Sequence, residues 1–314
     1  MGMTREIFFE LVEIRTKLAS LFPFLIGLLF SKFYFQQLNI HHMIVFFVGM
    51  LVFDMATTAI NNFMDFRKAQ DADYRKNHNI IGKAGLNEKK VGLLILGMIT
   101  LASLIGIYLT VQTSMLLLLI GGVCFFIGIF YTFGPIPLSR MPLGELFSGG
   151  TMGFGIFFIT IYLNTYDLGI IDFSLTDWQF VLKGDIQSLL VIILASLPMV
   201  FTIANIMLAN NICDLEQDIR NHRYTLPFYI GKETGIQLFG LLMYSCYVAV
   251  TLGVVIGVYR WPMLLTWGTF PLIYKNIRKF KQEQSKSLTF PLAIQNLVVF
   301  NTAQIIGLLI SLIF

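Results

Sequence analysis

Charge is scarce in this chain. Only 13% of its 314 residues are Asp, Glu, Lys or Arg, whereas 56% are hydrophobic. Soluble domains carry about 25% charged residues, so the composition excludes a soluble fold, and the mean hydropathy of +0.74 indicates an integral membrane protein. The sequence also lacks a Walker-type phosphate loop, a nucleophile elbow and a dinucleotide-binding fingerprint, and nothing in it supports nucleic-acid binding.

Cysteine and histidine are also rare. The cysteines are scattered in or beside apolar segments and form no CxxC pair, so we expect packing residues rather than disulfides or metal ligands. The histidines have no metal-ligand spacing. The N-terminal segment is charged and has no small-residue cleavage site after a short apolar core, so no signal peptide is predicted. The cysteines are Cys124, Cys213 and Cys246, and the histidines are His41, His42, His78 and His222.

Apolar stretches long enough to cross a bilayer, at about 20 residues each, recur along the whole chain. They predict an all-α membrane protein with nine transmembrane helices in a single domain, residues 1–314. The first stretch carries Arg15 and Lys17, and the eighth is short. The stretches lie near residues 14–35, 43–63, 91–111, 114–134, 147–165, 187–210, 235–258, 261–275 and 290–313.

The distribution of basic residues orients these helices. With the N-terminus inside, 19 of the 22 Lys and Arg residues lie on the inner face, and only Lys32, Lys183 and Arg260 lie on the other. Positively charged loops stay on the cytoplasmic side. The sequence therefore predicts a multi-pass protein of the cell membrane whose N-terminus and two long loops, residues 64–90 and 211–234, face the cytoplasm.

The five-residue word Asn-Asn-x-x-Asp occurs twice, each time where an apolar helix runs out into charged residues. The copies are Asn61–Asp65 and Asn210–Asp214, 149 residues and four predicted helices apart. Two same-direction repeats of four helices, closed by the ninth, would bring both copies to one end of a central cavity. Further carboxylates follow each copy: Asp71 and Asp73 after the first, Glu216 and Asp218 after the second.

Both copies place oxygen ligands on one face of a helix. Positions i, i+4 and i+7 share a face, a spacing that joins Asp54, Thr58, Asn61 and Asp65, and also Asn210, Asp214 and Asp218. Mg²⁺ takes oxygen ligands and commonly bridges carboxylates to substrate phosphates. The two patches therefore predict a divalent-metal site made of two halves, which is the chemistry needed to bind a diphosphate.

Basic residues surround both patches and can neutralise a departing diphosphate. For Lys89, Lys90 and the basic run at 275–286, ordinary cytoplasmic loop charge is the better interpretation. Asp54 stands apart, because it lies mid-helix about 16 Å deeper than Asp65 at 1.5 Å per residue. An intramembrane carboxylate is a functional candidate, although a neutral, hydrogen-bonded packing role for Asp54 is an equal alternative.

Taken together, these motifs resemble the UbiA superfamily of intramembrane prenyltransferases, whose first motif is NDxxDxxxD. The stretch 210–226 is similar to the NNxxDxxxDxxxGxxTL pattern of the 1,4-dihydroxy-2-naphthoate polyprenyltransferase branch, as are Tyr131–Pro137 and Leu143–Glu145. Arg15-Thr16-Lys17 resembles the first-helix motif of that branch. The chain departs from the patterns at Asn62 and Ala69, where Asp is usual, and at His222, where Gly is common.

The resemblance implies nine helices around a central cavity and a Mg²⁺-dependent transfer of a polyprenyl group from its diphosphate to 1,4-dihydroxy-2-naphthoate. Loss of CO₂ would give demethylmenaquinol, in menaquinone biosynthesis. The implied catalytic residues are Asp54 and Tyr131. The implied diphosphate ligands are Asn61, Arg67, Lys68, Arg75, Arg140 and Arg223. The implied metal ligands are Asn61, Asp65, Asp71, Asn210, Asn211, Asp214 and Asp218.

Two alternatives remain open from the sequence. One is another acceptor in the same superfamily, such as 4-hydroxybenzoate, haem or a sugar phosphate. The other is a secondary transporter for an anionic solute, since duplicated helices and the mid-membrane Asp54 would suit that class. Against the transporter, the carboxylates gather at one face instead of the midplane, and the helices lack paired Gly or Pro breaks.

Overall fold

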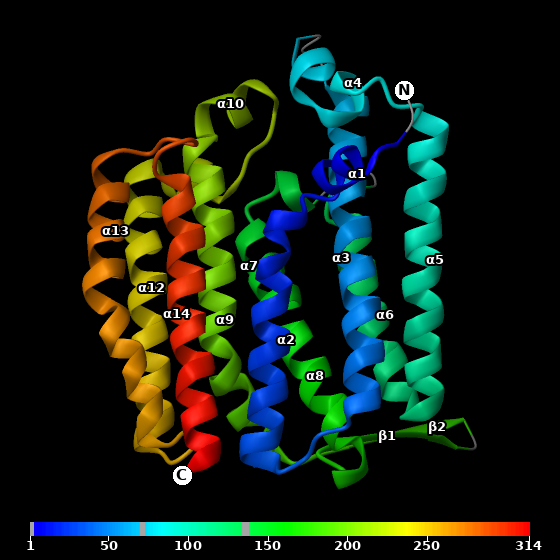
Figure 1. Cartoon of the computed structure of the whole chain (residues 1–314), viewed down its shortest axis with the longest axis vertical. Coiled ribbons are helices and arrows are strands. Elements are labelled where there is room, and N and C mark those ends of the chain that lie inside the picture. Colours follow the sequence, from blue (N-terminus) through cyan, green and yellow to red (C-terminus); the bar gives the residue numbers. More distant parts are fainter. Residues whose placement is uncertain (1–2, 70–72, 134–137, 177) are drawn as a thin grey trace.

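A computed structural model describes residues 3–69, 73–133, 138–176 and 178–314. The chain is almost entirely helical, and most of its helices run side by side along the long axis (Figure 1). Seven helical segments are long and apolar enough to cross a membrane: Leu18–Phe35, Ile40–Lys68, Glu88–Gln112, Gly144–Leu168, Ile186–Cys213, Lys232–Val255 and Phe290–Ile313. The predicted all-α membrane fold is confirmed.

The two other predicted spans take different forms. Helix α6 (Met115–Phe130) is apolar but has only 16 residues. The eighth predicted span begins as a 3₁₀ segment, η7 (Trp261–Thr269), and continues as helix α13 (Phe270–Gln282), whose last turn carries Lys279 and Lys281. The described residues thus contain seven clear spans, and the count of nine stays a prediction.

Polar caps set where the long helices begin. Asn39, Asn87, Ser114 and Asp185 each accept a hydrogen bond from a backbone N–H in the first turn of the following helix. Such caps satisfy donors that have no partner inside the helix. Helices α3 (Ile40–Lys68), α5 (Glu88–Gln112), α6 and α9 (Ile186–Cys213) therefore start at positions that the sequence itself marks.

Helices in equivalent positions of the two halves pack in equivalent ways. Helix α3 packs along α5, and α9 packs along α12 (Lys232–Val255). The first helices of the two halves are α2 (Leu18–Phe30) and α8 (Ile156–Thr165), and they contact each other. Helix α14 (Phe290–Ile313) packs against α2 and α9. This pairing agrees with the predicted four-helix repeats and a closing helix.

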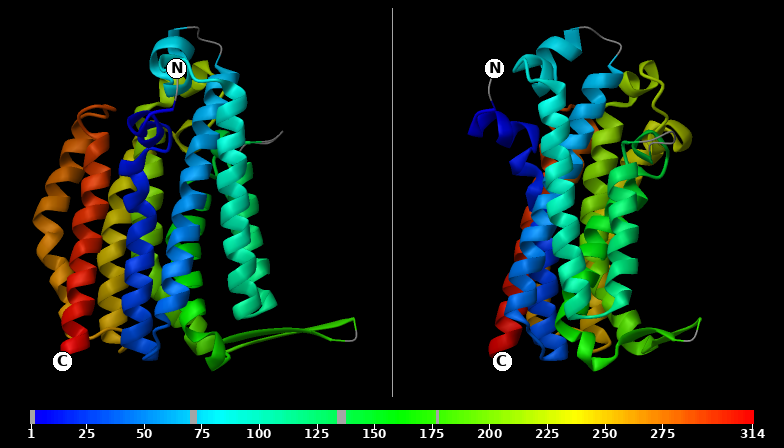
Figure 2. Two further views of the ribbon diagram at one scale, coloured as in Figure 1. Left: turned by 45° about the vertical axis from the view of Figure 1, so that its right-hand side comes forward. Right: turned by 90° about the vertical axis from the view of Figure 1, so that its right-hand side faces the viewer.

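The two interhelical loops that follow the motifs also resemble each other. After α3 come η3 (Tyr74–His78) and α4 (Ile80–Lys83), and after α9 come α10 (Leu215–Arg220) and α11 (Leu226–Ile230). All four short helices lie at one end of the bundle, together with the amphipathic N-terminal helix α1 (Arg5–Leu11) (Figures 1 and 2). They form a cap over that end.

No β-strand was predicted from the sequence. A β-hairpin, β1 (Ile171–Thr176) paired antiparallel with β2 (Gln179–Gly184), connects α8 to α9 at the opposite end of the bundle (Figure 1). The alternation of apolar and polar residues from Ile171 to Thr176 has the two-residue period of a strand. This short alternation is the local signal that distinguishes the hairpin from the helices around it.

His222, where the related pattern has Gly, adopts φ = 54°. This left-handed conformation costs a non-glycine residue about 1–2 kcal/mol. His222→Gly should therefore raise the free energy of unfolding by about 1 kcal/mol after the entropic cost of glycine, measured by thermal unfolding in detergent. Asn221→Gly is the control, because Asn221 has φ = −93° and gains nothing; equal effects of both substitutions would contradict the assignment of strain.

Candidate active site at the capped end of the bundle

The two Asn-Asn-x-x-Asp words occupy equivalent helix ends. Asn61 and Asp65 lie in the last two turns of α3, whereas Asn210 lies in the last turn of α9 and Asp214 caps that helix. Both ends point to the cap (Figure 1). The predicted approach of the two copies at one end of the fold is therefore present in the structure.

Asp65 of the first motif and Asp218 of the second lie close enough to interact electrostatically. Asp65 lies within electrostatic reach of Arg223, Arg140 and Lys68, and Asp218 feels the charges of both Asp65 and Arg223. Arg223 Nε stands 3.5 Å from Asp218 Oδ1. A half-buried carboxylate (Asp65) and a buried one (Asp218), from different repeats, thus share a basic surrounding, which is suited to a polyanionic ligand bridged by cations.

Asp218 carries the clearest electrostatic signature. Asp218 is 4% exposed. Burial raises the pKa of the Asp218 carboxyl to about 6, and the neighbouring charges of Asp214 and Asp65 act in the same direction, whereas Arg223 and Lys286 oppose them. A nearby cation would favour the ionised form, so a proton and a metal ion would compete for this group.

Lys286 occupies the outer part of the second half-site. This residue lies between α13 and α14, and its ammonium group donates to Asn210 Oδ1 at 2.5 Å and forms an ion pair with Asp214 Oδ2. It also lies over the ring of Phe290, 5.0 Å from the centroid. An ammonium ion thus holds two oxygen ligands that a divalent cation could use.

Asn211 also takes part in a buried cluster next to the second motif copy. Its Nδ2 donates to Glu145 Oε1 at 2.9 Å, and the neighbouring Tyr131 hydroxyl donates to Met207 Sδ at 3.5 Å. A Cβ at Gly144 would stand 3.1 Å from the Tyr131 oxygen. The absence of a side chain at Gly144 therefore leaves room for Tyr131 and Asn211, both of which lie close to this position.

The two asparagines of the first motif copy, Asn61 and Asn62, make different contacts. Asn61 Oδ1 accepts a hydrogen bond from Thr132, at the end of α6. Asn62 instead donates to the carbonyl of Leu11 at 2.9 Å and to Glu13 Oε1 at 3.3 Å. Asn62, where Asp is usual in the motif, therefore ties the N-terminal segment to α3.

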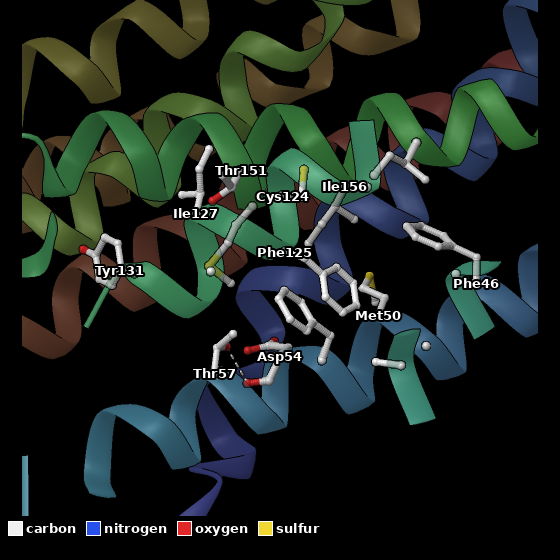
Figure 3. A pocket seen from close by; sticks show the side chains of 18 of the residues that line it. Phe46, Met50, Asp54, Thr57, Cys124, Phe125, Ile127, Tyr131, Thr151 and Ile156 are labelled. Atoms are coloured by element: carbon white, nitrogen blue, oxygen red, sulfur yellow. Dashed lines mark hydrogen bonds between the residues drawn. The ribbon is translucent and has the colours of Figure 1, made fainter. Parts of the chain in front are cut away.

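A cavity of about 540 Å³ extends from the motif toward the other end of the bundle. Its polar end is formed by Asn61, Thr57 and Tyr131, and the rest is largely apolar, with Phe125 and Met50 among its walls (Figure 3). Ligand pockets commonly combine such apolar walls with a few convergent polar groups. The shape suits a ligand with an anionic head and a long hydrocarbon tail.

Asp54 lies in the wall of this cavity and is ion-paired. Lys17 Nζ stands 2.6 Å from Asp54 Oδ1 and also donates to Thr58 Oγ1 at 2.6 Å, while Ser20 donates to Asp54 Oδ2 at 2.6 Å. The side chains of Lys17 and Asp54 are 7% and 12% exposed. Neither sequence interpretation of Asp54 included this partner.

Several predicted residues lie apart from the site or outside the described residues. Arg67 pairs with Glu88 of α5, with Nε 3.2 Å from Oε2, and Arg75 stacks over Phe66 at 4.7 Å from the ring centroid. Asp71 lies outside the described residues. The diphosphate role of Arg67 and Arg75 and the metal role of Asp71 stay predictions.

The chemistry of the donors fits a hard divalent cation. Among the described residues, no three carboxylate, His or Cys side chains gather closely enough to hold a metal alone. However, the buried oxygens Asp218 Oδ2 and Asn211 Oδ1 have no hydrogen-bond partner among the residues that the structure describes. Such buried acceptors are costly unless satisfied, and a cation shared with ligand oxygens would satisfy them.

Two residues of the site were missed from the sequence. Glu145 was noted only as part of a motif, although an acid in an otherwise apolar segment is itself a signal. Lys286 was assigned to ordinary loop charge, and no local signal distinguishes it from its basic neighbours. Its contact with Asp214 joins segments 72 residues apart, so only the tertiary structure shows it.

Comparisons with known proteins agree with this geometry. The UbiA prenyltransferase family model matches residues 20–297. The chain is 27% identical over 310 residues to the 1,4-dihydroxy-2-naphthoate octaprenyltransferase of Bacillus subtilis strain 168, covering 98% of this chain and 93% of that protein. An apo UbiA homologue from Aeropyrum pernix K1 shares the fold with a TM-score of 0.69 at 14% identity, covering 92% and 97% of the two chains.

A second solved structure shows the same fold. It is a UbiA homologue from Archaeoglobus fulgidus bound to GPP and Mg²⁺, similar to this chain with a TM-score of 0.61 at 11% identity and covering 98% of this chain and 100% of that one. At such identities the likeness concerns the fold.

Proposed function

This chain belongs to the UbiA prenyltransferase family, and we propose that it transfers a polyprenyl group from its diphosphate to 1,4-dihydroxy-2-naphthoate, with loss of CO₂, to give demethylmenaquinol. Membership in an enzyme family removes the transporter alternative. The observation that carries the proposal is the meeting of Asp65 and Asp218 beside Arg223, at the polar end of an apolar cavity. The relative in Bacillus subtilis supports the choice of acceptor.

The chain's own residues would bind the donor by charge and shape. Arg140, Arg223 and Lys68 surround Asp65 and would bind the diphosphate oxygens with charge-assisted hydrogen bonds. The apolar cavity would hold the polyprenyl tail. When the C–O bond to the diphosphate breaks, an allylic cation forms, and the aromatic walls would keep water from capturing it.

Mg²⁺ is the cation that we propose for the two half-sites. Asp65, Asp214 and Asp218 would hold it together with amide oxygens of Asn61, Asn210 and Asn211, and Asp71 is a further proposed ligand. The buried, unpartnered oxygens of Asp218 and Asn211 support this assignment. Bound Mg²⁺ would act as a Lewis acid on the diphosphate leaving group. The protein residues would fix the position of that group.

The acceptor would lie below the diphosphate. Asp54 and Tyr131 both line the cavity (Figure 3), and we propose that they position the naphthoate ring for attack on the allylic carbon. The new C–C bond replaces the carboxyl group, which leaves as CO₂, while the hydroxyl protons stay on the quinol. The cytoplasmic orientation of the cap also belongs to this proposal and rests on the basic residues around it.

The proposal predicts strictly metal-dependent turnover. Purified protein given 1,4-dihydroxy-2-naphthoate and a long polyprenyl diphosphate should form demethylmenaquinol and CO₂ with Mg²⁺ and none with EDTA. Product can be followed by mass spectrometry and CO₂ from a carboxyl-labelled acceptor. Diphosphate release without this product would reject the acceptor while keeping the prenyltransferase chemistry, and full activity in EDTA would reject the metal site.

Lys286 should compete with the metal. Because its ammonium group holds Asn210 and Asp214, Lys286→Met should lower the Mg²⁺ concentration for half-maximal rate by about tenfold, equal to about 1.4 kcal/mol. Lys279→Met, an exposed lysine of α13, is the control and should change nothing. A higher Mg²⁺ requirement together with a higher KM for the donor would instead make Lys286 a diphosphate ligand.

A further inference from the structure

The hairpin β1–β2 leaves the bundle sideways. It runs from the end where the C-terminus lies, across the direction of the long helices (Figures 1 and 2). Every residue of β2 is exposed. A two-stranded hairpin is at best marginally stable alone in water, so this projecting ribbon needs a further surface to stabilise it.

The register of the hairpin separates apolar from polar side chains. Residues directly opposite each other in an antiparallel pair share one face. On one face Asp172 lies opposite Lys183, so two opposite charges meet there. The other face is apolar, and its opposed pairs are Phe173 with Leu182 and Leu175 with Phe180.

The root of the hairpin fixes which way the apolar face points. Ile171 and Phe173 pack against the hydrophobic core of the bundle, and β1 contacts α6. Alternate residues of a strand point to the same side. Leu175 and its partner Phe180 therefore point to the side of the membrane-spanning helices, but beyond the bundle, where they are 64% and 73% exposed.

The backbone limits how deep the hairpin can lie. Both strands have an open edge, and unpaired N–H and C=O groups are excluded from the hydrocarbon core. Headgroups and water can satisfy these edges at the interface. Trp178, at the turn, is fully exposed, and the same end of the bundle carries Trp261, which is 67% exposed. Exposed tryptophans of this kind mark the membrane–water interface.

We propose that the hairpin is an interfacial anchor, lying flat on the leaflet opposite the two motifs with its apolar face in the lipid headgroup region. Asp172 and Lys183 then face water. The partner is the phospholipid surface itself. This assignment is independent of the proposed acceptor, because none of the hairpin residues belongs to the active site.

Tryptophan quenching tests the anchor directly. The full-length protein with Trp261→Phe and Trp267→Phe, which retains Trp178, is placed in phosphatidylcholine vesicles brominated on one acyl chain near the headgroup. We expect about a twofold loss of Trp178 emission, because interfacial rings lie at that depth, and protection from aqueous iodide. The comparison protein moves the reporter to the polar face with Trp178→Phe and Ser174→Trp, and it should show the reverse pattern.

A second comparison introduces single substitutions into the protein that retains only Trp178. Phe180→Asp should release the hairpin and reduce bromolipid quenching, whereas Val181→Asp, on the polar face, should leave it unchanged. Circular dichroism and a single size-exclusion peak establish folding. Free access of iodide to Trp178 without bromolipid quenching would overturn the proposal, because the hairpin would stand in water. Protection from both quenchers would also overturn it, in favour of a protein partner such as a second copy.

Discussion

Replacing either Asp65 or Asp218 by asparagine should reduce prenyl transfer by at least about 10²-fold, the scale of losing one transition-state electrostatic contact. The two carboxylates come from different repeats and lie in a shared basic environment. Each substitution would remove one charge that fixes the cation and, through it, the departing diphosphate. Rates are measured with saturating donor, acceptor and Mg²⁺.

The neighbouring acid Glu216 provides the control. It lies in α10, as Asp218 does, but it is exposed, so Glu216→Gln removes the same charge from the same short helix without touching the site. Groups that act as one unit are strongly non-additive, so the double variant Asp65→Asn with Asp218→Asn should be about as inactive as either single variant. Near-normal rates in both single variants would remove the two-part metal site.

Breaking the Lys17–Asp54 ion pair should have the largest effect on stability. Removing one partner of a buried pair leaves an uncompensated charge and costs about 3–5 kcal/mol. Lys17→Met would leave the Asp54 carboxylate without its partner, and Asp54→Leu would leave the Lys17 ammonium group without its partner. Both groups lie in an apolar wall, where their side chains are nearly inaccessible to solvent. The loss would appear as a fall in the temperature of unfolding in detergent.

The double variant Lys17→Met with Asp54→Leu distinguishes packing from catalysis. Replacing both charges by apolar groups is often neutral or stabilising, so the double variant should recover most of the lost stability. If it recovers activity as well, Asp54 has only a structural role. If it is stable and inactive, Asp54 is a catalytic or acceptor-binding residue; no recovery of stability at all would contradict the paired-charge explanation.

The spans and the motif copies could be predicted from the sequence because the bilayer imposes a length on each apolar helix. The equivalent helix ends of α3 and α9 followed from the same count, since four intervening helices return the chain to the same face. The eighth span was placed less well. Its predicted start at residue 261 agrees with the start of η7, but its predicted end at 275 falls short of Gln282, because the α13 portion is amphipathic and hydropathy alone does not mark where it ends.

The partners of the charged residues could not be predicted. Lys17 was placed in the first predicted span with no partner assigned, but it reaches Asp54 across 37 residues of sequence, and Lys286 reaches Asp214 across 72. Such contacts depend on how the helices are placed in three dimensions. Conversely, Arg67 was expected at the site, yet it pairs with Glu88, because helical residues two positions apart, such as Asp65 and Arg67, point to different sides.

The division of the site between α3 and α9 bears on how the protein is made. Asp65 emerges from the ribosome about 150 residues before Asp218, at a synthesis rate of about 5–20 residues per second. During that interval Asp65 has Lys68 close by in sequence, Arg140 is added about 75 residues later, and the second acidic half is still missing. The diphosphate site that we propose is therefore complete only after the sixth predicted span and the segment with Asp218 have been made, while three further predicted spans are still to follow.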